Sequence, residues 1–164
     1  MNIDYIQLPS PLFGFKQLFE ASKIVDNAFA AGYFNNHLKE IECGFVALDG
    51  DKVIGWAAVS VKTNESNSSE GLLRCIAVHP NYRGQGVGKR LTEKRLKYLD
   101  YCSSVWSYAW VRPNGNCMSC KNLENFGFKI HKELDDYYTT TRAKCKYCGK
   151  KCTCKAMLYV RQNC

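Results

Sequence analysis

The chain has 164 residues, 46% hydrophobic and 13% aromatic, which is enough apolar material for one compact core and too much for a disordered protein. Lys and Arg outnumber Asp and Glu by 23 to 15, giving a formal net charge of +8, but the basic residues are spread along the chain and indicate no dedicated nucleic-acid tract. No apolar run approaches the roughly 18 residues of a membrane span, and the first residues lack a signal-peptide pattern. We therefore expect a cytoplasmic protein without a membrane partner.

Hydrophobic periodicity predicts strands alternating with helices along the chain. The turn Asp49-Gly50-Asp51 between two apolar runs is a strong hairpin signal, and Pro11 suits the first turn of a helix. The expected strands cover residues 2–8, 44–48, 53–61, 71–78, 104–111, 128–138 and 156–160. The expected helices cover residues 11–29, 86–102 and 116–125, with a bend and a short helix within 30–41 and a polar loop at 63–70.

The most informative segment follows the strand that ends at Ile76-Ala77-Val78, where Arg83-Gly84-Gln85-Gly86-Val87-Gly88 leads into a helix. Glycines leave backbone N–H groups open to an anion, and the first helical turn adds unpaired N–H groups and a positive dipole end. A P-loop is excluded because Arg90 stands where Ser or Thr would bind Mg²⁺, and a dinucleotide fingerprint because Lys89 replaces its third glycine. A plain turn before an amphipathic helix would not explain three glycines in five residues. The segment indicates a phosphate-bearing cofactor.

This loop resembles the Arg/Gln-x-x-Gly-x-Gly/Ala pyrophosphate loop of the GNAT acetyltransferase superfamily. A second segment, from Asn116 to Gly127-Phe128, resembles the helix that leads into the next strand in that family, and the order of elements is similar over essentially the whole chain. The resemblance implies one domain over residues 1–164 with an α/β (α+β) fold, in which helices flank a single mixed, mostly antiparallel sheet. It also implies an N-acetyltransferase in which an amine attacks the thioester of acetyl-CoA directly.

The same resemblance implies where acetyl-CoA binds. The pantetheine arm would pair with the backbone at the end of the fourth strand, where a backbone N–H would polarise the thioester carbonyl, and the pyrophosphate would lie on the glycine loop. The cofactor-binding residues expected on this basis are Ile76, Ala77, Val78, Arg83, Gly84, Gln85, Gly86, Val87, Gly88, Lys89 and Asn116.

An attacking amine must lose a proton, so a carboxylate or imidazole should be within its reach. Glu70, just before the fourth strand, is our first candidate for this base, and glutamate at or near this strand has the role in several GNAT members. His79 is the second candidate, and Glu40 or Glu42 is a third possibility.

The expected general acid is missing. Many GNAT members carry, five residues before the Phe of Gly-Phe, a tyrosine that protonates the departing thiolate, and Leu123 occupies this position here. With a thiol pKa of about 8.5 by analogy with cysteine, the CoA thiolate can leave without a proton donor, so transfer should be slower but not abolished. Cys120 is our candidate replacement, with Tyr137 or Tyr138 as alternatives.

Four of the ten cysteines are concentrated in residues 145–154, as Cys145-x₂-Cys148-x₃-Cys152-x-Cys154. Disulfides are disfavoured in a reducing cytosol, whereas four thiolates satisfy tetrahedral Zn²⁺ with no open position, as in structural sites. We predict a zinc-binding insertion, a small Cys₄ knuckle in the last hairpin; an iron–sulfur cluster or a redox pair remains an alternative. Because this hairpin borders the acceptor pocket in GNAT proteins, the metal is expected to shape the acceptor side without entering the chemistry.

Cys117 and Cys120 form a second C-x₂-C pair inside a predicted helix, and we interpret them as ordinary thiols on neighbouring helix faces rather than as a redox or metal pair.

The sequence leaves the acceptor open between a small-molecule amine and a protein amine, and the protein is expected to be a monomer or homodimer. The alternative function is a non-catalytic, acetyl-CoA-fold zinc module that binds protein or nucleic acid, which the positive charge and the missing tyrosine would suit. The intact glycine loop argues against it, since a protein that does not bind CoA has no use for the loop. A nucleic-acid partner is not expected.

Overall fold

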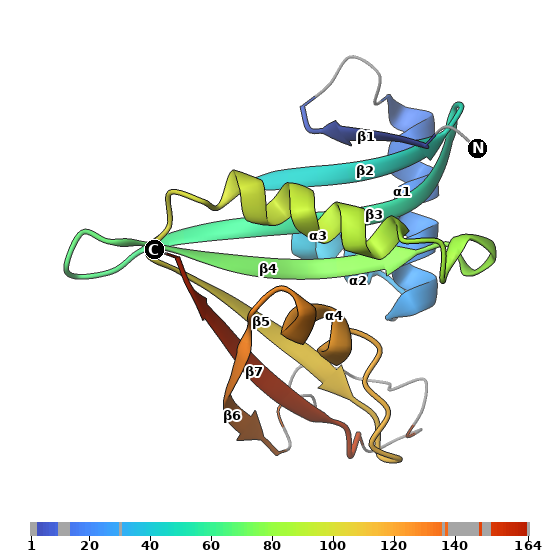
Figure 1. The fold of residues 1–164 in the computed structure, drawn as a ribbon. Helices are drawn as coiled ribbons and strands as arrows, with labels where there is room; N and C mark the ends of the chain where they lie inside the picture. Colours follow the sequence, from blue (N-terminus) through green and yellow to red (C-terminus); the bar gives the residue numbers. More distant parts are fainter. Residues whose placement is uncertain are drawn as a thin grey trace. The chain divides into compact units, whose positions relative to one another are not determined.

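The computed structural model of the protein describes residues 3–9, 14–29, 31–135, 137, 148 and 152–163. In this part of the chain, seven strands form one mixed sheet in the order β1-β2-β3-β4-β5-β7-β6, flanked by helices (Figure 1). The strands are β1 (Ile3–Gln7), β2 (Cys43–Asp49), β3 (Lys52–Thr63), β4 (Ser69–Val78), β5 (Ser104–Val111), β6 (Lys129–Leu134) and β7 (Lys155–Gln162). The helices are α1 (Phe15–Ala28), α2 (Tyr33–Leu38), α3 (Val87–Tyr98) and α4 (Cys120–Asn125), with a 3₁₀ turn, η1, at Pro80–Tyr82. The predicted fold class and order of elements are confirmed, and no described helix is long and apolar enough to cross a membrane.

The chain divides into two compact units. The first consists of Met1–Lys62 and Leu73–Tyr101, and the second of Thr63–Leu72 and Cys102–Cys164. Strand β4 therefore contributes to both, since its residues up to Leu72 belong to the second unit and its residues from Leu73 onward to the first.

In the first unit, α1 and α2 lie on one face of the strands and α3 lies on the other (Figure 1). The predicted hairpin is confirmed, because β2 and β3 pair antiparallel across Gly50. Ile24 and Val25 of α1 and Phe34 of α2 pack against Trp56 of β3 in one buried cluster. The apolar face of each helix is thus used against the sheet, as the helical spacing of these residues requires.

Close packing of α3 on the sheet depends on Gly55 of β3. A Cβ atom at this position would lie 3.0 Å from Leu91 Cδ1 and 3.1 Å from Val87 Cγ1, so a side chain here would push the helix away. Leu91 and Val87 are almost completely buried as a result.

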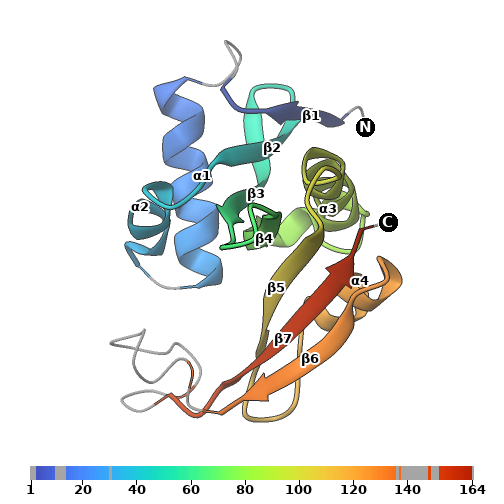
Figure 2. The same ribbon diagram turned by 90° about the vertical axis from the view of Figure 1, so that its left-hand side faces the viewer.

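In the second unit, β7 pairs antiparallel with both β5 and β6 (Figure 2). Along β5, Val105 and Ala109 are fully buried while Tyr108 is exposed, as expected for side chains that alternate between the two faces of a sheet. The hydroxyl of the buried Tyr159 in β7 donates to Glu124 Oε1 of α4 at 3.0 Å, which ties the helix to the strand.

One predicted boundary that bears on the site is wrong. The loop expected at 63–70 is shorter, because β4 begins at Ser69. The turn is closed by Asn64, whose Oδ1 accepts hydrogen bonds from the backbone N–H groups of Ser66 (3.1 Å) and Ser68 (2.9 Å). Glu70 consequently lies inside a strand instead of in a solvated loop.

The helix predicted at 116–125 begins only at Cys120. The residues before it form a turn in which Gly115 has φ +79° and the Arg112 N–H donates to the Asn116 carbonyl at 3.0 Å. Asn114 Oδ1 also accepts from the Asn116 N–H at 3.1 Å. Local side-chain hydrogen bonds of this kind compete with helix formation and delay its start.

The remaining differences are at helix and strand ends. Helix α1 begins at Phe15 and not at Pro11, which lies outside the described residues; Gln17 Oε1 accepts from the Gly14 N–H at 3.0 Å and fixes this start. Helix α3 ends at Tyr98 instead of residue 102, and β6 covers Lys129–Leu134 instead of 128–138.

The packing of α3 generates a prediction. Leu91→Ala should lower the free energy of unfolding by about 2 to 5 kcal/mol, because it leaves a cavity between α3 and β3. Urea denaturation followed by circular dichroism measures the change. Lys94→Ala, on the exposed side of the same helix, is the control and should change stability by less than about 0.5 kcal/mol. Equal effects of the two substitutions would contradict this packing.

Candidate functional site

In the glycine loop between β4 and α3, two glycines adopt left-handed backbone angles. Gly84 has φ +75° and Gly86 has φ +81°, in the left-handed region that residues with a side chain avoid. Gly86 is the N-cap of α3, and the first helical hydrogen bond runs from the Arg90 N–H to the Gly86 carbonyl at 3.0 Å. The N–H groups of the preceding residues of the first turn therefore have no carbonyl acceptor within the helix.

The third glycine of the loop has a different role. Gly88 has an ordinary φ, and a Cβ atom there would lie 3.8 Å from Val78 Cγ2 and 4.0 Å from Ile76 Cδ1. The first turn of α3 thus lies beside the end of β4. The structure brings together, within the first unit, the two segments predicted to bind the pyrophosphate and the pantetheine.

Hydrogen bonds fasten this loop to the strands. The His79 N–H donates to the Ile54 carbonyl at 2.8 Å, and the Tyr82 hydroxyl donates to Asp49 Oδ2 at 2.8 Å. Arg83 Nε donates to the Val78 carbonyl at 3.1 Å, and the Gln85 amide donates to the Asn81 carbonyl at 3.0 Å. The loop is therefore held in place before any ligand binds.

The charged side chains at the loop are exposed. Arg83 and Lys89 lie at the surface, and Arg90 pairs with Glu93 at 3.1 Å. Together with the N–H groups and the positive end of α3, these cations make the loop suited to an anionic group such as a pyrophosphate.

A buried arginine beside the loop was missed by the sequence analysis. Arg95 of α3 is only 2% exposed and donates to the Arg74 carbonyl of β4 and to Thr92 Oγ1, each at 3.1 Å. Thr92 Oγ1 in turn donates to the Gly88 carbonyl at 2.9 Å, so a chain of hydrogen bonds joins β4 to the first turn of α3. Burial lowers the pKa of Arg95 to about 10, which leaves it charged at neutral pH. The sequence does contain a signal for this burial, because Arg95 is four residues from both Leu91 and Leu99 and so shares the apolar face of the helix with them.

The buried thiol nearest to this arginine is not a nucleophile. Burial raises the pKa of Cys75 to about 11, although Arg95 and a hydrogen bond with Trp56 oppose the rise. Cys75 is therefore protonated at neutral pH and acts as a small core side chain.

The candidate bases differ in the hydrogen bonds and ion pairs that they form. Glu40 forms an ion pair with Arg74, and Glu42 accepts a hydrogen bond from the Tyr98 hydroxyl at 3.4 Å. His79 Nδ1 accepts from the Asn81 N–H at 3.3 Å, a structural role in the turn before the loop. Glu70 is half-buried in β4, and within the described residues its carboxylate has no hydrogen bond or ion pair. Of these groups, Glu70 is the carboxylate that is not already committed to another side chain.

Cys120 does not have the thiol that its predicted role requires. It is joined to Cys117 in a disulfide, and its N–H points to Cys117 Sγ at 3.1 Å. The interpretation of these cysteines as separate thiols inside a helix is therefore wrong, since Cys117 precedes the helix and the two sulfurs are bonded. A disulfide sulfur has no proton to donate, so Cys120 is a possible acid only after reduction.

The structure also shows where other residues considered for the acid role lie. Leu123 is buried in α4 and offers no proton. Tyr137 stacks on Tyr108 with ring centroids 5.0 Å apart, and Tyr138 lies outside the described residues. Asn116, the last predicted cofactor residue, is exposed in the turn before α4 in the second unit.

Three of the four cysteines predicted to bind metal come together in the second unit. The sulfur atoms of Cys148, Cys152 and Cys154 all lie within 4.8 Å of one another. Cys145 lies outside the described residues. The part of the cluster that the structure describes is thus compatible with the predicted metal site.

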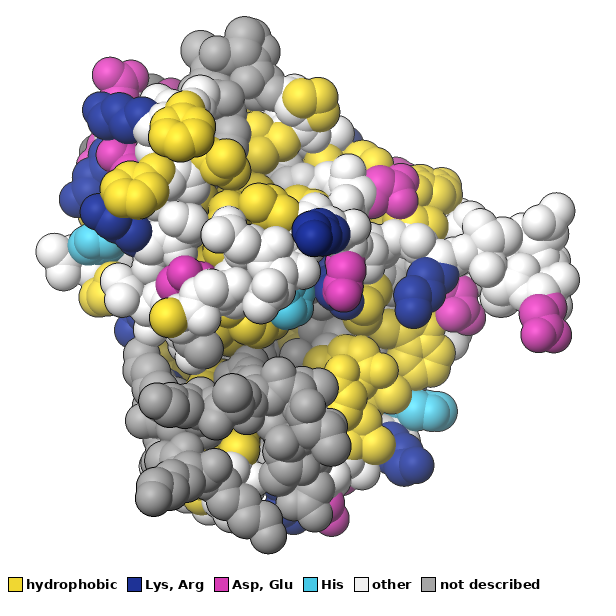
Figure 3. Space-filling model, turned by 180° about the vertical axis from the view of Figure 1, so that it is seen from behind, with side chains coloured by type: hydrophobic (Ala, Val, Ile, Leu, Met, Phe, Trp, Pro, Cys, Tyr) yellow, Lys and Arg dark blue, Asp and Glu magenta, His cyan; other side chains and the backbone are white. Residues whose placement is uncertain are grey.

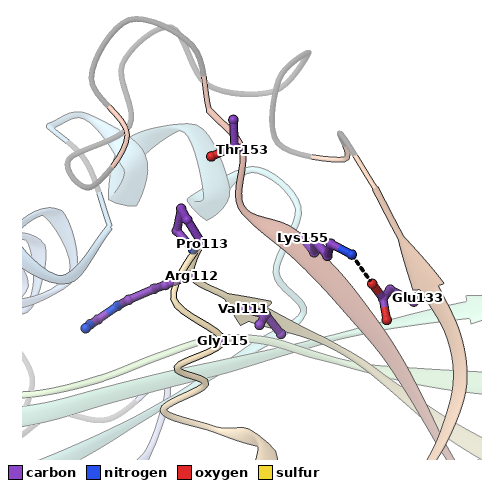
Figure 4. A pocket seen from close by; sticks show the side chains of 7 residues that line it. All are labelled: Val111, Arg112, Pro113, Gly115, Glu133, Thr153 and Lys155. Carbon is purple, nitrogen blue, oxygen red and sulfur yellow. Dashed lines mark hydrogen bonds and ion pairs between the residues drawn. The ribbon is translucent and has the colours of Figure 1, made fainter.

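A surface pocket opens next to this cluster (Figure 4). It is lined by Val111, Arg112, Pro113, Gly115, Glu133, Thr153 and Lys155. Lys155 is paired with Glu133 and, at 3.1 Å, with Asp135, and the hydrogen bond to Glu133 raises the pKa of Lys155. No predicted catalytic or cofactor residue lines this pocket.

Charge is mixed on the face of the protein shown in Figure 3. Lys and Arg side chains alternate there with acidic, hydrophobic and uncharged ones, without one continuous basic surface among the described residues. Phe15 and Phe19 of α1 are exposed, and Lys23 Nζ lies 4.2 Å from the Phe19 ring centroid.

Comparison with known proteins assigns the family. The model of the acetyltransferase (GNAT) family matches residues 10–128, which is more than half of the chain. The protein belongs to the GNAT acetyltransferase family.

Individual proteins that resemble this chain have low sequence identity to it. The chain is 28% identical over 97 residues to N-alpha-acetyltransferase 30 of Schizosaccharomyces pombe; the match covers 59% of this chain and 64% of that protein, less than two thirds of its length. Among solved structures, one similar fold is in the NatC complex bound to Gag peptide and CoA (TM-score 0.74, 18% identity, 99% of both chains). Another is Naa50 of Arabidopsis thaliana in complex with the bisubstrate analogue CoA-Ac-MVNAL (TM-score 0.74, 16% identity, 99% of both chains). At these identities the structural likeness shows the fold.

The glycine loop generates a prediction. Gly86→Ala places a side chain at a left-handed residue, which costs about 1 to 2 kcal/mol and shifts the N–H groups of the loop. The affinity for acetyl-CoA, measured by calorimetry, should fall at least about tenfold.

Gly50→Ala is the matched control. Gly50 also has a positive φ, +57°, and open surroundings, but it lies in the β2–β3 turn. This variant should lose similar stability and keep its affinity. An unchanged affinity in Gly86→Ala would show that the loop does not hold the ligand.

Proposed function

We propose that this protein is an acetyl-CoA-dependent N-acetyltransferase in which an amine attacks the thioester directly. The observation that carries the proposal is the glycine loop, where unpaired N–H groups at the start of α3 lie beside the end of β4. Membership of the GNAT family supports this assignment. We take the whole chain, residues 1–164, as one catalytic domain.

On the donor side, the loop from Arg83 to Lys89 would hold the pyrophosphate. Its backbone N–H groups and the positive end of α3 supply the attraction, and the exposed Arg83 adds a full charge. The backbone of Ile76, Ala77 and Val78 would pair with the pantetheine arm. A backbone N–H of this strand would stabilise the negative charge that develops on the thioester oxygen, with little reorganisation because the strand is already held by α3.

On the acceptor side, Glu70 would take the proton of the attacking amine, directly or through a water molecule. Its uncommitted carboxylate supports this role. Because Leu123 cannot donate a proton, the CoA thiolate would leave unprotonated, or would be protonated by Cys120 in the reduced protein. A thiolate is stable enough for the first route.

The acceptor that we favour is the α-amine of a peptide or protein. One relative is named N-alpha-acetyltransferase 30, and the Naa50 structure holds the bisubstrate analogue CoA-Ac-MVNAL. A small-molecule amine is the alternative. We propose a cytoplasmic, monomeric or homodimeric protein.

Zn²⁺ would be a structural cofactor in this enzyme. Thiolate ligands that fill its coordination leave no position for a substrate, and the transfer step proposed above needs no Lewis acid. The metal would order the connection between β6 and β7, on the acceptor side in GNAT proteins.

The proposal predicts acetyl transfer to an amine panel. Purified protein should release CoA thiol from acetyl-CoA with peptides that have an unblocked N-terminus, and much less with the same peptides after N-terminal blocking. Thiol release and mass spectrometry of the peptide measure the reaction. Binding of acetyl-CoA without turnover on peptides or small amines would support the non-catalytic alternative, and absence of binding would end the proposal.

The base assignment predicts a catalytic defect. Glu70→Gln should lower kcat by about 10² or more with little change in acetyl-CoA affinity, because the attacking amine would lose its proton acceptor. Glu65→Gln, in the exposed loop before the same strand, is the control and should behave as the unmodified protein. If Glu70→Gln keeps kcat within about twofold, another group is the base.

A further inference from the structure

Three cysteines of the second unit, Cys148, Cys152 and Cys154, form a cluster. Cys152 and Cys154 directly precede β7, and Cys148 comes from the connection between β6 and β7. Cys152 is 4% and Cys154 0% exposed. They pack with Ala156 and, at the edge of the cluster, with Trp110 of β5, Leu134 of β6 and Tyr137. Side chains from β5, β6 and β7 therefore pack around the cysteines.

The sulfur positions fit a metal better than a disulfide. Cys148 Sγ and Cys154 Sγ are 3.4 Å apart, far beyond the roughly 2.05 Å of an S–S bond. None of the three cysteines is in a disulfide. Ligands about 2.3 Å from a tetrahedral Zn²⁺ lie about 3.8 Å from one another, which is close to the observed separation and within the 4.8 Å that spans the cluster.

The Thr153 hydroxyl donates to Cys148 Sγ at 3.6 Å, and sulfur is a weak hydrogen-bond acceptor. A thiolate set of this kind selects soft or borderline metals, and tetrahedral geometry with sulfur ligands is typical of Zn²⁺.

We propose that Cys148, Cys152 and Cys154 bind one Zn²⁺, and that this metal holds Cys148 against the residues that precede β7, beside Trp110 and Tyr137. This proposal does not depend on acetyl transfer, because it concerns the coordination and stability of the second unit.

The first experiment measures the metal itself. Protein purified without chelators should contain about one Zn²⁺ per chain by elemental analysis. Replacement by Co²⁺ should give the intense visible bands and near-ultraviolet sulfur-to-metal charge transfer of a tetrahedral thiolate site. Substoichiometric metal after reconstitution, or Co²⁺ spectra without thiolate bands, would overturn the proposal, and iron with sulfide would replace it by an iron–sulfur cluster.

Variants locate the site. Cys148→Ser and Cys154→Ser should each lose most of the bound metal, whereas Cys43→Ser should retain it. Cys43 is a matched control because it is also buried, lies in the first unit, and donates through its sulfur to the Leu8 carbonyl at 3.4 Å, a bond that serine can keep. Retention of metal in both cluster variants would place it elsewhere.

Chelation of the unmodified protein covers the case in which a cluster variant fails to fold. Removing the metal should lower the melting temperature and shift the tryptophan emission to the red, and added Zn²⁺ should reverse both changes. In Trp110→Phe the melting temperature should still fall but the emission should change little, since Trp56 lies in the core of the first unit and Trp106, farther along β5, packs against His131 and not against the cysteines. Chelation without an effect on either measurement would contradict the structural role.

Discussion

The passage of the chain from β4 into α3 depends on backbone angles that only glycine adopts readily, at Gly84 and Gly86. These angles let the helix begin one residue after Gly86, so that the N–H groups of its first turn remain available next to the end of the strand. Arg83, Tyr82 and Gln85 then fasten the loop through hydrogen bonds to neighbouring segments. The site that we propose for the pyrophosphate is therefore part of the fold and would not have to be assembled by the ligand.

Two packing features hold the helix in the position that this site requires. Gly55 lets α3 approach β3 closely, and Arg95 bonds the helix to β4 from inside the core. Burying a guanidinium without a carboxylate partner is unfavourable, and burial accordingly lowers its pKa. Its hydrogen bonds to the Arg74 carbonyl and to Thr92 offset part of this penalty. The connection from Thr92 to Gly88 extends the restraint to the first turn of the helix.

The second unit contains three features that bear on the proposed acetyl transfer. The buried Leu123 stands where the resemblance to GNAT proteins predicts a tyrosine acid, a disulfide joins Cys117 to the first residue of α4, and three thiols come together before β7. The first unit, by contrast, contains the glycine loop.

Local signals in the sequence were sufficient for the glycine loop, the β2–β3 hairpin, the order of the elements and the family, because each depends on residues within a few positions of one another. Local signals did not predict the whole candidate site. Glu70 was expected in a loop, and its place in β4 depends on a strand that lies between β3, which precedes it directly, and the more distant β5. The burial of Arg95 depends on how α3 packs on the sheet, and the bond between Cys117 and Cys120, three residues apart, depends on the turn before α4.

The sequence by itself determined that this chain has a glycine loop at the start of a helix in an acetyltransferase fold and a dense cluster of cysteines, since glycine conformation, apolar periodicity and cysteine spacing are local properties. Only the tertiary structure decided that Glu70 keeps an uncommitted carboxylate while Glu40 and Glu42 are engaged, and that Cys148 lies against Cys154. Those outcomes follow from long-range packing, which places side chains by the shape and hydrogen bonding of the whole core and not by their neighbours in sequence.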